Sequence, residues 1–351
     1  MIRRFERRLR RNELVRRVAG PIVRRIRAAR SANGPASRTG HAGNAAYPTH
    51  FAIQPRPAAL PEPWPEPPAI DRPFEAASDP GRPPPPTRYD LALFEQLNAE
   101  YAAKPIVSAA PRYDPTTLAD RSRRRLAAIH DRIGLADRTV LEIGCAAGYE
   151  VWYLGQHLGC DAWGIDVTPR NSWPALAGDR VHLVHGDIAD RGTLPAETFE
   201  RVISFTVWEH ITRPIEAIAE LQRVMKPGAL AWIRANLYRG PTASHRARDI
   251  HFPFPHLLFQ DDVIYEALGR AGKVPRGASW VNRLTWEQYE LEFLRAGLLI
   301  RSLSFDHYPL DEAFYRRFED VLGRYPREDL ERGFFQVVLE KPVASSGPSS
   351  G

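Results

Sequence analysis

The clearest chemical pattern in the sequence is a turn of small residues that follows an apolar run. Residues 140–143 indicate a buried strand, and Gly-Cys-Ala-Ala-Gly at 144–148 predicts a turn that opens a helix at Tyr149. Glycine lets a ligand approach the backbone closely, and the free amides at a helix N-terminus attract a carboxylate. Glycine turns follow strands in many α/β proteins, so the turn gains meaning only from its neighbours.

Acidic residues accompany three successive predicted strands. Glu142 lies in the first, Asp166 closes the second 24 positions later, and Asp187 follows the third. A carboxylate at Asp166 can accept both hydroxyls of a ribose, while Asp187 can accept from an adenine amino group with Ile188 packed on the ring. Singly, Glu142 could cap a helix, Asp187 could form a turn and Cys145 could be a packing residue. Their order favours a nucleoside ligand.

An alternation of strands and helices positions these residues. Helical periodicity fills several segments between apolar runs, and the helix at 215–224 ends at Lys-Pro-Gly 226–228. Two helices are expected before the sheet, at 91–101 and 115–133, with Asp114 as the N-cap of the second. Short apolar runs predict buried strands and hence a parallel α/β sheet. The predicted strands are 139–143, 162–166, 181–185, 201–206, 229–235, 298–305 and 334–340.

The fourth strand runs into Glu209-His210, and with this pair the sequence resembles the class I S-adenosylmethionine-dependent methyltransferases of the broad small-molecule type. Leu-Gln-Arg-Val-Met-Lys-Pro-Gly at 221–228 extends the resemblance, which covers roughly residues 118–340. It implies an α/β, Rossmann-like, doubly wound sheet of seven strands, mostly parallel with an antiparallel last strand, plus N-terminal helices. It also implies S-adenosyl-L-methionine as the cofactor.

The resemblance further implies which residues hold that cofactor. Glu142 and the turn would hold the methionine portion, Asp166 the ribose, and Asp187 with Ile188 the adenine. Ala146 departs from the family, which usually has a third glycine there, and its methyl group narrows the turn. The expected cofactor-binding residues are Glu142, Gly144, Cys145, Ala146, Gly148, Asp166, Val167, Asp187, Ile188, Phe205, Thr206 and Trp208, of which the last three would border the sulfonium.

Histidines are the candidate general bases. An insertion at 238–284, on the substrate side in this fold, contains His245, His251 and His256. Their spacing around two prolines does not match a helical metal motif, so no metal is expected. An aromatic lid with surface histidines is an equally good interpretation of the insertion. The candidate catalytic residues are Glu209, His210, His251 and His256.

Composition divides the chain into four parts. Residues 1–30 hold twelve arginines against two glutamates, a charge of +10, with apolar residues at helical spacing. They predict a basic amphipathic arm for an anionic membrane surface, with a partner-docking helix or a solvated tail as alternatives. Residues 31–88 hold fifteen of the 32 prolines and predict a disordered linker. A methyltransferase domain at 89–341 and a flexible tail at 342–351 would follow.

Charge and cysteine content exclude several classes of protein. Without the arm the net charge is 6 − 10 = −4, which gives no support to nucleic-acid binding. Two cysteines cannot form a disulfide framework, and no apolar stretch reaches the ~20 residues of a membrane span. We therefore expect a cytoplasmic protein, held peripherally at the inner face of the membrane if the arm docks there.

The predicted function is O-methylation of a small molecule or of a saccharide or lipid-linked glycan by in-line displacement. The arm favours a glycan acceptor near a membrane. A dehydrogenase of related fold is disfavoured because the turn lacks the Gly-x-Gly-x-x-Gly spacing. The alternative is a noncatalytic module of the same fold, recruited to a membrane or to partners by the arm.

Overall fold

The computed structural model describes residues 89–105, 114–273 and 281–343. The arm at 1–30, the linker at 31–88 and most of the tail at 342–351 lie outside these residues, so those assignments stay predictions. Within the described part of the chain, no helix combines the length and the hydropathy that crossing a bilayer requires.

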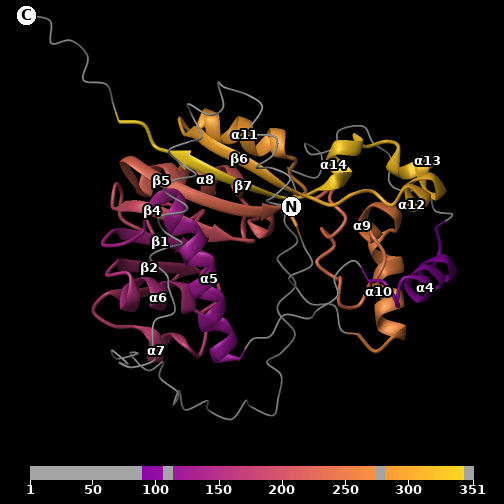
Figure 1. Ribbon diagram of the computed structural model, residues 1–351, viewed down its shortest axis with the longest axis horizontal. Coiled ribbons are helices and arrows are strands. Elements are labelled where there is room, and N and C mark those ends of the chain that lie inside the picture. Colours follow the sequence, from indigo (N-terminus) through magenta and orange to yellow (C-terminus); the bar gives the residue numbers. More distant parts are fainter. Residues whose placement is uncertain (1–88, 106–113, 274–280, 344–351) are drawn as a thin grey trace, which may run out of the picture. The chain divides into compact units, whose positions relative to one another are not determined.

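A seven-stranded sheet runs through the domain (Figure 1). Its strands are β1 (Thr139–Ile143), β2 (Asp161–Asp166), β3 (Val181–His185), β4 (Phe199–Phe205), β5 (Met225–Asn236), β6 (Leu299–His307) and β7 (Arg332–Glu340). They lie in the order β3-β2-β1-β4-β5-β7-β6. The first five strands in this order, β3, β2, β1, β4 and β5, are parallel to one another. Strand β7 is antiparallel to both of its neighbours, β5 and β6. The predicted fold class, including the antiparallel last strand, is confirmed.

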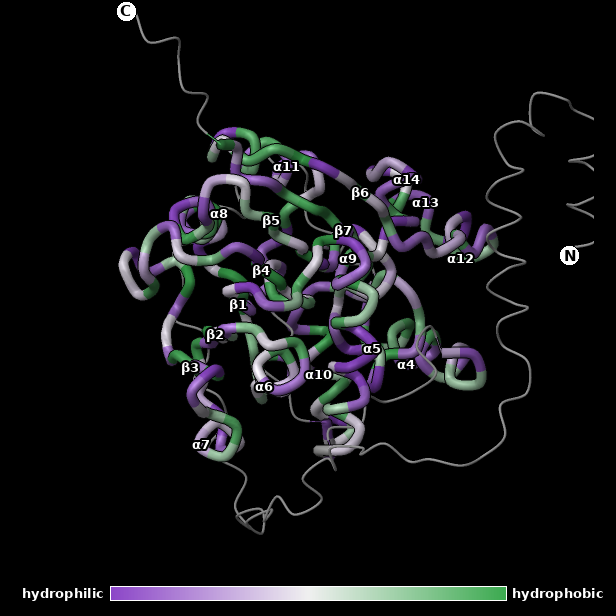
Figure 2. Tube along the Cα trace, turned by 60° about the vertical axis from the view of Figure 1, so that its left-hand side comes forward, coloured by the Kyte–Doolittle hydropathy of each residue, from purple (hydrophilic) through white to green (hydrophobic). Residues whose placement is uncertain are grey.

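Helices cover both faces of this sheet. They are α5 (Pro115–Ile133), α6 (Tyr149–His157) and α7 (Trp173–Leu176) on one face, and α8 (Pro214–Val224) and α11 (Trp286–Arg295) on the other. Leu126 and Val151 belong to the apolar core of the first face, and Leu221 and Phe293 to that of the second. Figure 2 shows hydrophobic and hydrophilic residues alternating along the helices, as expected when one side of each is buried.

Local capping fixes where two of these helices begin. The side chain of Asp114 accepts a hydrogen bond from the backbone N–H of Thr117 at 2.9 Å, and Pro115 occupies the first turn of α5 as predicted. Thr285 and Gln288 form a capping box at the start of α11. The sequence signal at Asp114 therefore acts as the helix start that it predicts.

A second group of helices forms what we call the helical cap, at the carboxyl ends of the parallel strands (right of Figure 1). It comprises α4 (Leu91–Glu100), α9 (Pro255–Leu258), α10 (Asp261–Arg270), α12 (Glu312–Arg317), α13 (Glu319–Leu322) and α14 (Arg327–Glu331). The cap has its own apolar core, in which the ring of Phe94 lies 5.2 Å from those of both Phe252 and Phe259. The predicted insertion at 238–284 is thus one part of a larger unit.

Candidate active site

The turn after β1 has the backbone conformation that its small residues suggest. Gly144 has a φ of 74°, and a Cβ atom there would lie 2.2 Å from Cγ2 of Val207, so a side chain at this position would force Val207 to move. Gly148, at a φ of 82°, is the N-cap of α6. Ala146 also has a positive φ, 45°, although it carries a methyl group. The departure from glycine at this position is therefore accommodated by a strained backbone.

Asp166, at the end of β2, is bonded to this turn. Its Oδ2 accepts a hydrogen bond from the backbone N–H of Ala146 at 2.8 Å, and its Oδ1 accepts one from Thr168 at 2.9 Å. Each carboxylate oxygen has a further acceptor position. The side chain is thus fixed by the protein and still able to accept from a ligand hydroxyl.

Asp187, after β3, is held in a similar way by an arginine that the sequence analysis did not single out. Its Oδ1 accepts from the backbone N–H of Ala189 at 2.8 Å, and its Oδ2 accepts from Nη2 of Arg213 at 3.1 Å. Arg213 also pairs with Asp190, and these two carboxylates raise the pKa of its guanidinium. No spacing rule in the sequence points to Arg213, because it lies at the start of α8, whereas its partners Asp187 and Asp190 follow β3.

The strand ends surround a cavity of about 180 Å³ at the carboxyl edge of the sheet, which we call the strand-end cavity. Its walls include Val207 and Ile211, which the sequence analysis did not name as binding residues. Six predicted residues line it, namely Gly144, Asp166, Val167, Asp187, Ile188 and His210. Residues from four separate strand ends are thus brought to one place.

Glu142 lies beneath the turn, buried beside a second carboxylate. Burial raises its pKa well above the usual range, Glu150 adds to the shift, and Arg125 and Arg121 oppose it. Glu150 itself pairs with Arg125 at 3.2 Å. Oε2 of Glu142 has no hydrogen-bond partner within the described ranges. A buried acceptor without a donor fits a ligand that supplies one.

Comparison with known proteins identifies the domain. Residues 141–233 match the family model described as a methyltransferase domain, and they contain the turn, both strand-end aspartates and Glu209-His210. The domain belongs to the class I S-adenosylmethionine-dependent methyltransferases. Its cofactor is S-adenosylmethionine, and the orphaned oxygen of Glu142, the glycine turn and the two fixed aspartates fit that ligand.

Individual relatives match over limited lengths. A ubiquinone biosynthesis O-methyltransferase of Pseudomonas paraeruginosa is 30% identical over 124 residues, 33% of this chain and 51% of that protein. A tRNA U34 carboxymethyltransferase of Shewanella pealeana is 32% identical over 100 residues, 27% of this chain and 30% of that protein. The chain thus spans about half or less of these curated relatives. A solved S-adenosylmethionine dependent methyltransferase from Mesorhizobium loti is 15% identical, with a TM-score of 0.44, over 63% of this chain and 99% of that chain.

Seven of the twelve predicted cofactor residues do not line the strand-end cavity, namely Glu142, Cys145, Ala146, Gly148, Phe205, Thr206 and Trp208. Phe205 and Thr206 line a separate hollow against α5, where the guanidinium of Arg125 lies 4.8 Å from the ring centroid of Phe205. The indole of Trp208 has no exposed surface and packs in the core, 6.1 Å from the ring of Phe293. Cys145 is buried and burial raises the pKa of its thiol, so it serves packing.

The predicted catalytic residues separate into two groups. Glu209 and His210 lie in the 3-10 turn η1 (Trp208–His210), and His210 lines the strand-end cavity of the methyltransferase domain. Glu209 is buried, and burial raises the pKa of its carboxyl to about 8. The ring of His245, from the loop after β5, lies 4.6 Å from that of His210. The sequence placed His245 only within the insertion, and no spacing signal joined it to this pair.

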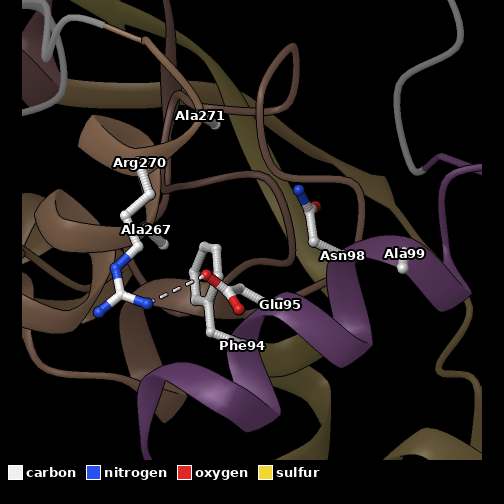
Figure 3. Close-up of a pocket in the computed structure, with 7 residues that line it drawn as sticks. All are labelled: Phe94, Glu95, Asn98, Ala99, Ala267, Arg270 and Ala271. Carbon is white, nitrogen blue, oxygen red and sulfur yellow. Dashed lines mark ion pairs between the residues drawn. The ribbon is translucent and has the colours of Figure 1, made fainter.

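The other two histidines lie within the helical cap. The backbone N–H of His251 donates to Oδ1 of Asn98 at 2.7 Å, and Nε2 of His256 lies 2.6 Å from the carbonyl oxygen of Tyr238. Figure 3 shows Asn98 on α4 beside a hollow that α10 borders, where Arg270 pairs with Glu95. Neither His251 nor His256 lines the strand-end cavity. Their part in catalysis stays a prediction that this placement does not favour.

Proposed function

We propose that the protein transfers a methyl group from S-adenosylmethionine to a hydroxyl group of a small molecule or saccharide. The observation that carries the proposal is the strand-end cavity, which His210 lines together with residues expected to hold the cofactor. The relative of ubiquinone biosynthesis is named an O-methyltransferase, which supports oxygen as the acceptor atom.

The residues of the chain have separable tasks in this reaction. When bound, S-adenosylmethionine supplies a methyl group already activated by the sulfonium charge. Gly144, Asp166 and Asp187 would hold and orient it, and Val207 with Ile188 would pack against it from the apolar part of the cavity wall. His210 would assist removal of the proton from the acceptor hydroxyl as that oxygen attacks.

We further propose that the acceptor is a lipid-linked glycan or another substrate near a membrane. The support is the charge of +10 in residues 1–30, together with their apolar residues at helical spacing. A cytoplasmic protein held at the inner face of the membrane would meet such substrates.

Calorimetric titration of the full chain with S-adenosylmethionine and S-adenosylhomocysteine tests the cofactor step. Incubation with phenolic, polyol and saccharide acceptors, with S-adenosylhomocysteine formation as the readout, tests the transfer. Binding of both ligands and turnover with one acceptor class is expected. A folded protein that binds neither ligand contradicts the proposal, whereas binding without turnover on any acceptor supports the noncatalytic alternative.

A further inference from the structure

Three side chains with metal-binding atoms converge beside the strand-end cavity. One ligand atom from each of Glu209, His210 and His245 lies within 4.8 Å of the other two. Nε2 of His245 is 3.8 Å from Oε1 of Glu209, and the two imidazole rings are perpendicular at 89°. We call these three residues the Glu-His-His cluster.

The cluster contains buried polar atoms that the protein leaves unsatisfied. The side chain of Glu209 is only 3% exposed, and neither of its oxygens has a hydrogen-bond partner in the part of the chain that the structure describes. Nε2 of His245 is likewise buried and without such a partner there. Their separation of 3.8 Å is too long for the two groups to satisfy each other. Buried polar atoms without partners are costly, and a bound cation would satisfy these atoms together.

The backbone around the cluster is firmly held by the core. Asn282 donates its backbone N–H to the carbonyl oxygen of Glu209 at 2.7 Å and its Nδ2 to that of Trp208 at 2.7 Å. The hydroxyl of Tyr289 donates to the carbonyl oxygen of Trp208 at 3.0 Å. His245 has a φ of 54°. Fixed supports of this kind keep metal ligands in place.

We propose that Glu209, His210 and His245 bind a divalent transition-metal ion, of the zinc type, whose open positions take the hydroxyl oxygen of the acceptor. This inference rests on the proposed methyl transfer and departs from the expectation of no metal. Two imidazoles and one carboxylate suit Zn²⁺, Fe²⁺ or Co²⁺ better than Mg²⁺ or Ca²⁺, and three protein ligands leave room for a substrate.

The distances suit an ion after a small closure. Metal bonds to nitrogen and oxygen are about 2.0–2.2 Å, so neighbouring ligand atoms lie roughly 3–3.5 Å apart around one ion. Rotation of the three side chains that moves each ligand atom by about 1 Å would bring these atoms to this spacing. A hydroxyl bound to such an ion is more acidic than a free one. The ion would then assist loss of the acceptor proton to solvent water, and His210 would act through the ion.

The test uses the full chain, freed of metal with a chelator and titrated with Co²⁺, whose visible absorption reports its ligands. We expect one tight site per chain. Glu209→Gln and His245→Asn should each weaken Co²⁺ binding by about 10-fold or more. Asparagine tolerates the left-handed backbone of residue 245, and glutamine keeps the shape of Glu209. The matched control is His307→Asn, an exposed histidine on β6, which should bind Co²⁺ as the parent protein does.

Parallel calorimetry with S-adenosylmethionine separates this inference from the proposed function. Absence of a tight Co²⁺ site in the folded parent protein, or equal binding by the parent and both cluster variants, would overturn the metal site. If S-adenosylmethionine still bound, methyl transfer would stand without the ion. A folded protein that bound Co²⁺ but not S-adenosylmethionine would contradict the proposed function and with it the acceptor role of the ion.

Discussion

The backbone nitrogen of Ala146 lies 2.8 Å from Oδ2 of Asp166, which ties the turn after β1 to the end of β2. One hydrogen bond thus connects the two segments expected to hold different parts of the cofactor. Because both are fixed before a ligand arrives, binding need not order them. Changes at either end of this bond should therefore affect the affinity for the cofactor.

The first prediction concerns Asp166. Asp166→Asn should weaken S-adenosylmethionine binding by about 10-fold or more, because hydrogen bonds to a charged group contribute roughly 1.5–3 kcal/mol. Calorimetric titration of the folded variant measures this. Asp161→Asn, at the other end of the same strand, is the control and should bind normally. Unchanged affinity in Asp166→Asn would remove the ribose assignment.

The second prediction separates backbone strain from a steric clash. Gly144 and Gly134 both have positive φ, but a Cβ atom at Gly134 meets nothing within 4 Å, whereas one at Gly144 meets Val207 at 2.2 Å. Gly134→Ala should cost about 1 kcal/mol of unfolding free energy, and Gly144→Ala clearly more, with loss of cofactor binding. Chemical denaturation and calorimetry measure the two effects. Adding Val207→Ala to Gly144→Ala should restore part of the stability; no recovery would contradict the clash.

The third prediction is that the free energy of unfolding falls at acid pH because His256 is buried in its neutral form. The pKa of His256 is lowered from 6.5 to about 4, chiefly by burial and to a smaller extent by the charge of Arg283, while the carbonyl of Tyr238 opposes the shift. Because the folded pKa lies below the unfolded one, this stability is complete above 6.5 and is lost as the pH falls towards 4. The loss is at most about 3 kcal/mol.

Denaturation of His256→Gln across that pH interval measures the effect. The slope of unfolding free energy against pH should be smaller than in the parent protein, although some slope remains because burial also lowers the pKa of His245, to about 3. The exposed His307 is the control, and His307→Gln should keep the parent slope. An unchanged slope in His256→Gln would mean that the histidine is not buried in its neutral form.

The fourth prediction is that residues 1–30 bind anionic membranes. Twelve arginines attract such surfaces, while Phe5, Leu9 and Val18 would add a contribution that salt does not screen. In flotation assays the full chain should rise with phosphatidylglycerol vesicles and not with neutral ones. A chain lacking residues 1–30 should rise with neither. Equal recovery of both chains would leave the membrane proposal without support.

Much of the sheet and part of the site were predictable from the sequence. Apolar runs mark buried strands, and parallel strands end at one edge, so the order of the strands alone brings Asp166, Asp187 and His210 together. The position of Trp208 could not be predicted. Thr206 has a φ of 53°, which ends the alternation of side chains along β4. Sequence position alone therefore does not tell that Val207 faces the cavity and Trp208 the core.

Contacts between segments that are distant in the sequence could not be predicted either. Arg213 reaches Asp187 across a strand end, and His245 reaches Glu209 through a loop that holds a histidine in the left-handed region. Neither position follows a periodicity or a turn signal, because each is set by packing after the sheet has formed. Residues of this kind become visible only in three dimensions.

The core of the helical cap draws Phe94, Phe252 and Phe318 from three parts of the chain that are far apart in sequence. Segment 238–284 is therefore not an exchangeable module. Transplanted alone into another methyltransferase, it would carry apolar surface meant for α4 and α13, and its removal here would strip those helices of their cover.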